Sequence, residues 1–426
     1  MPATPRPLLG GGRGILVVLA LALALTAAAC SKRTAFIVPD VTVGTPQFDR
    51  LMEAHTLSSM AHGNDVRLLL NGEQIFPAML SAIRHARQTI TFANYLYEDG
   101  AIADEFAEAF AERCRAGVGV SILLDATGSS QMPRRLREYM QRSGCHVERF
   151  HPVNAFTFRR VNHRNHRRIL VIDGQVGFVG GTGIGTNWTG DGKTPHHWRQ
   201  TDVRVAGPVV RALQAAFAEP WRETTGLLLG DDAYFPAVEP AGKVNSESVK
   251  SSPVGGAAEA YMLFLLAIEG ARSSIRITNP YFVPDTPILE AMERAVARGV
   301  RVDIIMAGEA DTNLDRIVRK ASQATFGRAL AAGIRIHEYR GALLHAKTIT
   351  VDGRWSSVGS ANLDRRSFAL NHELNLAFDD PGLARQLEQI FADDLTRCHE
   401  VTLAEWRRRG IGRVLELVVL PLRDQL

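Results

Sequence analysis

Two histidines in this 426-residue chain are each followed, two positions later, by a cationic residue. His166 precedes Arg168, and 179 positions further along the chain His345 precedes Lys347. Both pairs begin apolar runs typical of a strand, in which residues two apart point to the same face. The spacing therefore predicts that each histidine shares a face with its cation, and that this arrangement occurs twice.

Imidazoles beside fixed cations suit the cleavage of a phosphodiester. The negative charge of the diester repels an attacking oxygen, so a neutral imidazole is a sensible first nucleophile, and a phosphohistidine divides one hard displacement into two. A second, protonated imidazole can donate to the departing alkoxide and then activate the next alcohol or water. Arg168 and Lys347 would hold the non-bridging phosphate oxygens. The spacing does not decide which histidine attacks.

Both runs end in an Asp-Gly pair, with Asp173 in the first copy and Asp352 in the second. Asp before Gly is a strong signal for a hairpin turn. The repeated position also makes both aspartates candidate catalytic residues, and the sequence leaves the two roles open.

The similarity between the two copies extends well beyond the histidines. Three further segments recur in the same order, with residues 82–91, 116–120 and 144–150 answered by residues 267–276, 298–302 and 333–339. Helical patterns alternate with apolar strands, which predicts an α/β fold with a buried, partly parallel sheet. We expect two tandem domains, 65–235 and 257–400, joined by a linker rich in Pro, Gly and Ser at 236–256.

The second copy carries the more specific pattern. After Lys347 come the run Gly-Ser-Ala-Asn-Leu-Asp-Arg-Arg-Ser-Phe at 359–368 and Asn-His-Glu at 371–373. Two His-x-Lys-x4-Asp motifs with this tail resemble the phospholipase D superfamily, and within it most closely the bacterial cardiolipin synthases. The likeness covers roughly 65–400. The first copy departs from it at Arg168, where the family has Lys, and at Gly183, where an Asn would match Asn362.

The resemblance implies two α/β-sandwich domains that form one active site at their interface, with no metal and no other cofactor. It favours His166 as the nucleophile and His345 as acid and base. Asp202 and Glu373 would orient the two imidazoles. The resemblance also implies that Ser360 and Asn362 donate hydrogen bonds to the phosphate. Because Arg keeps its charge and can bind two oxygens, Arg168 is a plausible replacement for Lys.

The two ends of the chain indicate a membrane. Residues 1–30 carry two arginines, an apolar run and small residues before Cys30, as in a signal peptide or lipoprotein leader, with an uncleaved anchor as the alternative. Residues 401–426 read as an amphipathic helix with Trp406 and three arginines, suited to an anionic interface or to docking on its own domain. We expect an exported protein associated with the periplasmic face of a membrane, with a lipoprotein acylated at Cys30 as one outcome for the leader.

Composition narrows the remaining choices. Lys and Arg number 49 against 45 Asp and Glu, a net charge of +4 that is too near neutral for a protein held to nucleic acid by its whole surface. Of the cysteines at 114, 145 and 398, three cannot all pair, so buried thiols are the simpler expectation and one bridge stays open.

Three functions follow, in different classes. The first is phosphatidyl transfer from a lipid resembling phosphatidylglycerol to an alcohol, as in cardiolipin synthesis. The second is hydrolysis of a lipid or nucleic acid phosphodiester by a phospholipase D-type enzyme. The third is non-catalytic lipid binding, motivated by Arg168 and Gly183. We expect a phospholipid substrate, a membrane surface and no nucleic acid as partners, and the oligomeric state stays open.

Overall fold

The computed structural model describes residues 36–152, 162–253, 258–308 and 313–408. Cys30, the rest of the leader and residues 409–426 of the expected C-terminal helix lie outside these ranges. None of the helices in this part of the chain is long and apolar enough to cross a membrane.

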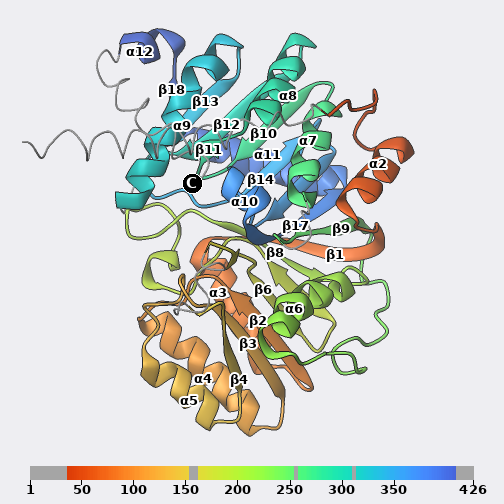
Figure 1. Cartoon of the computed structure of the whole chain (residues 1–426), viewed down its shortest axis with the longest axis vertical. Coiled ribbons are helices and arrows are strands. Elements are labelled where there is room, and N and C mark those ends of the chain that lie inside the picture. The colour runs from red at the N-terminus through yellow and green to blue at the C-terminus, as the bar shows by residue number, and fades with distance from the viewer. Residues whose placement is uncertain (1–35, 153–161, 254–257, 309–312, 409–426) are drawn as a thin grey trace, which may run out of the picture. The chain divides into compact units, whose positions relative to one another are not determined.

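Most strands join one large sheet, whose strands are labelled in both halves of the chain in Figure 1. In sheet order, the first half contributes β1 (Ala61–Leu70), β8 (Thr201–Ala206), β7 (Val176–Val179), β6 (Ile169–Ile172), β2 (Thr89–Asn94), β3 (Gly119–Asp125) and β4 (His146–Phe150). The second half contributes β9 (Val244–Ser251), β17 (Asn371–Asp379), β15 (Trp355–Gly359), β14 (Thr348–Val351), β10 (Ser274–Thr278), β12 (Arg301–Ala307), β13 (Arg335–Tyr339) and an added β18 (Cys398–Val401).

The order of the first seven strands is the same in both halves, counted outward from the centre. The two sets meet where β1 pairs antiparallel with β9. Among these seven strands, the last three are parallel in each set (β2, β3 and β4 in the first, β10, β12 and β13 in the second). The strands nearer the centre are antiparallel, and so is the added β18. The structure thus confirms an α/β fold built from two copies, and shows that their sheets are continuous.

Helices cover the sheet in both halves. They are α2 (Pro46–Thr56), α3 (Asn71–Arg84), α4 (Ala101–Arg115), α5 (Arg134–Arg142), α6 (Val210–Thr225), α7 (Glu259–Glu269), α8 (Thr286–Ala297), α9 (Asn313–Ala331), α10 (Arg365–Ala369), α11 (Pro381–Leu395) and α12 (Leu403–Arg408). Helix α7 is apolar and buried on nearly every side, as expected of a helix enclosed by its neighbours.

The two halves also share a hydrophobic core. One buried cluster joins Phe217 of α6 and Val203 of β8 to Leu376 of β17 and Leu387 of α11. This core takes side chains from both halves. Separating the halves would therefore expose apolar surface, at a free-energy cost of about 25 cal/mol per Å². The junction is therefore a packed interior, which fixes the relative position of whatever each half carries.

The expected linker at 236–256 is wrong in its second part. Residues Val244–Ser251 form β9, which pairs with β17 over seven residues and also with β1. Its sequence Val-Asn-Ser-Glu-Ser-Val-Lys-Ser is polar and follows a segment rich in Pro and Gly, so it carries little apolar alternation. The strand forms because partners on both sides complete its backbone hydrogen bonds.

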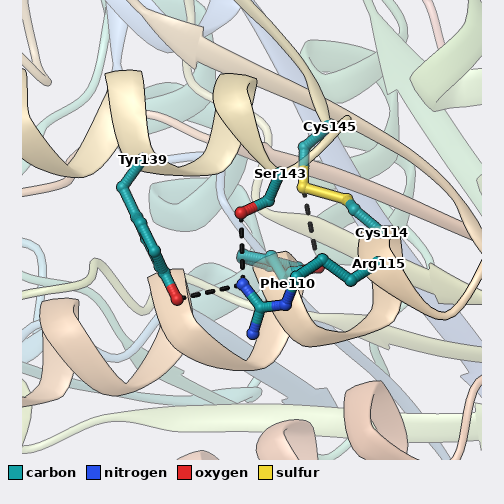
Figure 2. The surroundings of a disulfide bond; sticks show 6 residues. All are labelled: Phe110, Cys114, Arg115, Tyr139, Ser143 and Cys145. Atoms are coloured by element: carbon teal, nitrogen blue, oxygen red, sulfur yellow. Dashed lines mark hydrogen bonds between the residues drawn. A yellow bond between two sulfur atoms is a disulfide. The ribbon is translucent and has the colours of Figure 1, made fainter.

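The cysteines also differ from the simpler expectation. Cys114, at the end of α4, is disulfide-bonded to Cys145, just before β4, while Cys398 is a free thiol. Figure 2 shows the bond beside Arg115, which donates to Tyr139 Oη (3.1 Å) and Ser143 Oγ (3.2 Å). The bridge joins the C-terminal end of α4 to the residue directly before β4, the outermost strand of the first half. Spacing gave no means of choosing this pair.

The C-terminal segment starts differently from the expected helix over 401–426. Val401 ends β18, and helix α12 begins at Leu403. Trp406 is buried and packs against Phe326 of α9, with ring centroids 5.4 Å apart. Trp406 therefore contacts its own domain and is not available to a lipid interface.

Candidate active site

Each histidine is held by main-chain bonds to the opposite half. The short strand β5 (Arg164–Asn165) pairs in parallel with β17, and the amide of His166 donates to the carbonyl of His372 (3.0 Å). In the mirrored arrangement, the amide of His345 donates to the carbonyl of Arg199 (2.8 Å). The fold thus brings the two histidines to the junction, each anchored by the half that does not contain it.

The ring of His166 is oriented by a buried carboxylate. Its Nδ1 lies 2.9 Å from Oε1 of Glu373, and Ser360 Oγ and Asn371 Nδ2 lie 2.5 and 3.3 Å from the same carboxylate. Ser360 Oγ accepts from the amide of Leu374, so its own proton is the one donated to Glu373. A carboxylate with three donors around it favours the ionised form, with the proton on Nδ1 of His166 and the Nε2 lone pair free.

Burial and the neighbouring cations shift the pKa values of this pair. Burial lowers the pKa of His166 well below its ordinary range, and the charges of Arg168 and Lys347 lower it further. Burial raises the pKa of Glu373 to about 7, against the lowering effect of the Ser360 hydrogen bond and the charge of Arg168. His166 is therefore neutral at physiological pH, which is the state that a nucleophilic imidazole requires.

His345 has different surroundings. Lys347 Nζ lies 3.0 Å from its Nδ1 and 3.3 Å from its Nε2, and donates to its carbonyl (2.8 Å). The rings of Trp188 and Trp198 flank the imidazole at 4.6 and 5.8 Å. Burial lowers the pKa of His345 well below its usual value, and the charges of Lys347 and Arg168 add to that effect. An ammonium group only donates, so the ring nitrogen nearest to it acts as an acceptor.

Arg168 and Lys347 make the site strongly cationic. Both side chains are buried, and within the described ranges neither forms an ion pair. Arg168 donates to the carbonyl of His166 (2.5 Å), lies over the ring of Tyr95 at 5.4 Å, and its Nε has no hydrogen-bond partner there. Burial lowers the pKa of Lys347 well below its ordinary range, and Arg168 lowers it further. Two buried cations that form no ion pair within the described ranges, although the carboxylates of Glu373 and Asp202 are near, make this a candidate phosphate site.

Not every predicted site residue joins this cluster. Asp173 accepts from the amides of Arg87, Gln88 and Thr89 at the start of β2, and Asp352 accepts from those of Arg272, Ser273 and Ser274 at the start of β10. Both have positive φ, in the turns at the ends of β6 and β14 remote from the histidines. Their carboxylates tie the hairpins to the starts of β2 and β10, and the structure does not bring them to the two histidines.

Two further expectations change in the same way. Ser360 was expected to bind phosphate, but its hydroxyl is fully buried and its proton serves Glu373. Asp202 was expected to orient a histidine, but it accepts from the amide of Gly181 (3.0 Å) and from Gln200 Nε2 (2.7 Å). No hydrogen bond joins it to His166 or His345 in the described structure. The side-chain oxygen of Asn362, Oδ1, is buried and has no hydrogen-bond partner among the described residues.

The departure at Gly183 has a steric cause. A Cβ atom at this position would lie 2.9 Å from Trp188 Nε1 and 2.9 Å from Leu96 Cδ2. Trp188 is buried and its ring also contacts His345. The indole therefore fills the space in which an Asn at 183 would sit.

Sequence reasoning missed several residues that shape the site. Tyr95 lies against His166 with ring centroids 5.0 Å apart. Beside it, Asn94 donates to the carbonyl of Thr182 (3.1 Å), and its repeat counterpart Asn279 donates to that of Ala361 (3.3 Å). These asparagines hold the loops that follow the hairpins. Their recurrence after the repeated segments 82–91 and 267–276 was the signal that could have identified them.

The same pattern of residues occurs in known proteins. The family described as cardiolipin synthase, phospholipase D-like domain, matches this chain twice, at residues 79–219 and 264–395. The chain belongs to this family. It is an enzyme of the phospholipase D superfamily, and the two matches coincide with the two halves of the sheet.

Relatives and solved structures agree with this family. Cardiolipin synthase A of Pseudomonas fluorescens is 37% identical over 349 residues, which cover 81% of this chain and 71% of that protein. Cardiolipin synthase of Staphylococcus aureus is 33% identical over 351 residues, covering 82% and 70%. The crystal structure of phosphatidylserine synthase from Haemophilus influenzae matches with a TM-score of 0.64 at 13% identity, covering 89% of this chain and all of that one, and shows the shared fold.

Proposed function

We propose that this protein is a phosphatidyltransferase that moves a phosphatidyl group from phosphatidylglycerol to an alcohol through a covalent phosphohistidine. The observation that carries the proposal is the contrast between the two histidines. His166 offers a free Nε2 because Glu373 occupies its Nδ1, whereas His345 lies beside an ammonium group. One imidazole is therefore arranged to attack and the other to exchange a proton.

The first step forms a bond between His166 Nε2 and phosphorus. The lone pair of Nε2 attacks, the bond from phosphorus to the glycerol oxygen breaks, and its electrons go to that oxygen. The anionic diester offsets the charges of Lys347 and Arg168 that lower the pKa of His345 in the free enzyme, and so stabilises its protonated form. Protonated His345 then gives a proton to the departing alkoxide, so glycerol leaves. Arg168 and Lys347 supply positive charge for the non-bridging oxygens as the five-coordinate state develops.

The second step reverses the roles. The hydroxyl of the acceptor gives its proton to His345 while its oxygen attacks phosphorus, and the phosphorus–nitrogen bond breaks with its electrons returning to His166. When the acceptor is a second phosphatidylglycerol, the product is cardiolipin. When the acceptor is water, the product is phosphatidic acid.

The same proposal includes the location of the enzyme. Disulfides persist in oxidising compartments such as the periplasm, so the bond between Cys114 and Cys145 supports export, in agreement with the leader at 1–30. A phospholipid substrate requires access to a membrane surface. We propose that the enzyme works on the periplasmic face of a membrane.

Purified protein incubated with phosphatidylglycerol vesicles tests this function by mass spectrometry of the lipids. We expect cardiolipin and glycerol in equal amounts, and neither product from His166→Ala. A matched control is His399→Ala, because His399 lies in the edge strand β18 and pairs with Glu405. Phosphatidic acid as the sole product would show that the enzyme hydrolyses the lipid and does not transfer the phosphatidyl group. Turnover by His166→Ala equal to that of wild type would refute the covalent route.

A further inference from the structure

The two halves can be compared residue by residue because their strands pair in the same register. Val358 pairs with Leu376 in β15 and β17, and the counterpart Val179 pairs with Val203 in β7 and β8. Leu376 therefore corresponds to Val203. Three residues earlier in each segment, Glu373 of β17 corresponds to Gln200, which directly precedes β8.

A second and independent register gives the same correspondence. Ahead of the histidines, Asn165 pairs with His372, and the counterpart Leu344 forms a bridge with Arg199. His372 therefore corresponds to Arg199. The next residue in each segment is again Glu373 or Gln200. The counterpart of the carboxylate that orients His166 is thus a neutral amide, and it lies two residues before Asp202.

Two other positions around the histidines also carry hydrogen-bond donors to a carboxylate in the second half and lack them in the first. The offset of 179 residues and the two registers relate Ser360 to Gly181 and Asn371 to Trp198. In the second half these residues surround His166 with a hydroxyl and an amide that both donate to Glu373. In the first half they leave His345 with a glycine and an indole ring 5.8 Å away.

Gln200 is built into this neutral surrounding. Its side chain is 1% exposed, Nε2 donates to Asp202 Oδ1 (2.7 Å), and Oε1 has no partner in the described structure. A Cβ atom at Gly181 would lie 2.7 Å from Gln200 Nε2 and 3.4 Å from Lys347 Nζ. The amide and the ammonium group that contacts His345 therefore both lie against Gly181, in space that a side chain at residue 181 would fill.

We propose that Gln200 is a positioning residue that divides the work between the two histidines. By placing a neutral amide where the second half places Glu373, it leaves Lys347 beside His345 and reserves the carboxylate-supported imidazole, His166, for attack on phosphorus. The inference rests on the proposed function. The inference adds that the first-half residues around His345 determine which histidine is the nucleophile and which is the proton donor.

The charges around His345 explain why a carboxylate at 200 would change its role. The largest charge effects on its ring come from Lys347, Arg168 and His166, none of which is an anion. The buried carboxylate of Asp202 accepts from the amide of Gly181 and acts on Lys347 and Arg168. An opposite charge within about 4–6 Å shifts a pKa by about 1–3 units. In Gln200→Glu, the new carboxyl group would face Asp202, to which the amide now donates at 2.7 Å, and while protonated it can make the same hydrogen bond. Once it ionises, its charge would stabilise the protonated form of His345 and would also compete for Lys347.

The first test is the pH profile of kcat for phosphatidylglycerol turnover by Gln200→Glu. We expect its alkaline limb, which reports loss of the proton from the acid, to move up by about 1–2 pH units. The matched control is Gln214→Glu, which buries a carboxylate at an equally buried position of α6 where Thr91 Oγ1 donates to the amide. A limb that moves no further in Gln200→Glu than in Gln214→Glu would overturn the inference.

The second test maps the phosphatidyl adduct by mass spectrometry of peptides from enzyme quenched during turnover. We expect the adduct on His166 in wild type, and a fraction on His345 in the exchanged variant Gln200→Glu/Glu373→Gln. An adduct on His345 in wild type would overturn the role of Gln200 while leaving the covalent route intact. If wild type forms no adduct, the covalent route itself fails, and the pH profile still decides whether Gln200 controls His345.

Discussion

Replacing Ser360 by alanine distinguishes two roles for this hydroxyl. The sequence pattern predicted that Ser360 binds phosphate, whereas its proton is donated to Glu373 at 2.5 Å and its oxygen accepts from the amide of Leu374. A hydroxyl has a single proton to donate. We therefore expect Ser360→Ala to act through the pair of Glu373 and His166, and to leave lipid binding almost unchanged.

The size of the effect follows from the charge on Glu373. A hydrogen bond to a charged group contributes about 1.5–3 kcal/mol. This carboxylate must stay ionised while positive charge develops on His166 in the transition state, and burial already raises its pKa to about 7. At about 1.4 kcal/mol for each factor of ten, kcat should fall about 10- to 100-fold.

The assay is steady-state turnover of phosphatidylglycerol in mixed micelles, which separates kcat from KM. Ser357→Ala is the matched control, because Ser357 is equally buried in β15 and accepts from Asn375 Nδ2 (3.2 Å), away from Glu373. The control should lose stability and keep its kcat. A KM raised more than about tenfold with kcat unchanged would show that Ser360 binds the substrate, and would refute the geometric reasoning.

Three further predictions concern stability. Asp352→Asn should lower the free energy of unfolding by about 1–2 kcal/mol in denaturant titrations with kcat preserved, and a loss of activity without a loss of stability would contradict its structural role. Cys114→Ser with Cys145→Ser should cost about 3–4 kcal/mol for a 31-residue separation, and reduced wild type should match the double variant. Burial raises the pKa of Glu247 to about 7, so stability from this protonated group is present below pH 4.5 and lost as pH rises through 7. Glu247→Gln should therefore be more stable than wild type at pH 8 by about 1–3 kcal/mol in urea titrations, and equal stability at that pH would show that Glu247 carries no such penalty.

The sequence was sufficient for the parts of the site that repeat. The repeated spacing of His166 and His345 from their cations predicted that the two histidines act together, because such a repeat is improbable by chance. The α/β alternation and its duplication were readable for the same reason. These features depend on local pattern, which a sequence displays directly.

The parts that could not be predicted depend on pairing between distant segments. Gln200 could not be recognised as the counterpart of Glu373, since only strand register relates them and Asp202 is the nearer acidic residue. The disulfide between Cys114 and Cys145 needed the packing of α4 against α5, after which Cys145 follows in the chain. The strand β9 is polar, and its existence depends on two partners that are far away in the chain.

The pairing of β1 with β9 makes this chain a covalent dimer of its own halves. An isolated half would leave one of these strands as an unpaired edge, which readily joins the edge of another molecule. Two first halves joined in this way would place a Gln200 amide beside both histidines and a carboxylate beside neither. Linking the copies in one polypeptide thus guarantees that every active site receives one partner of each kind.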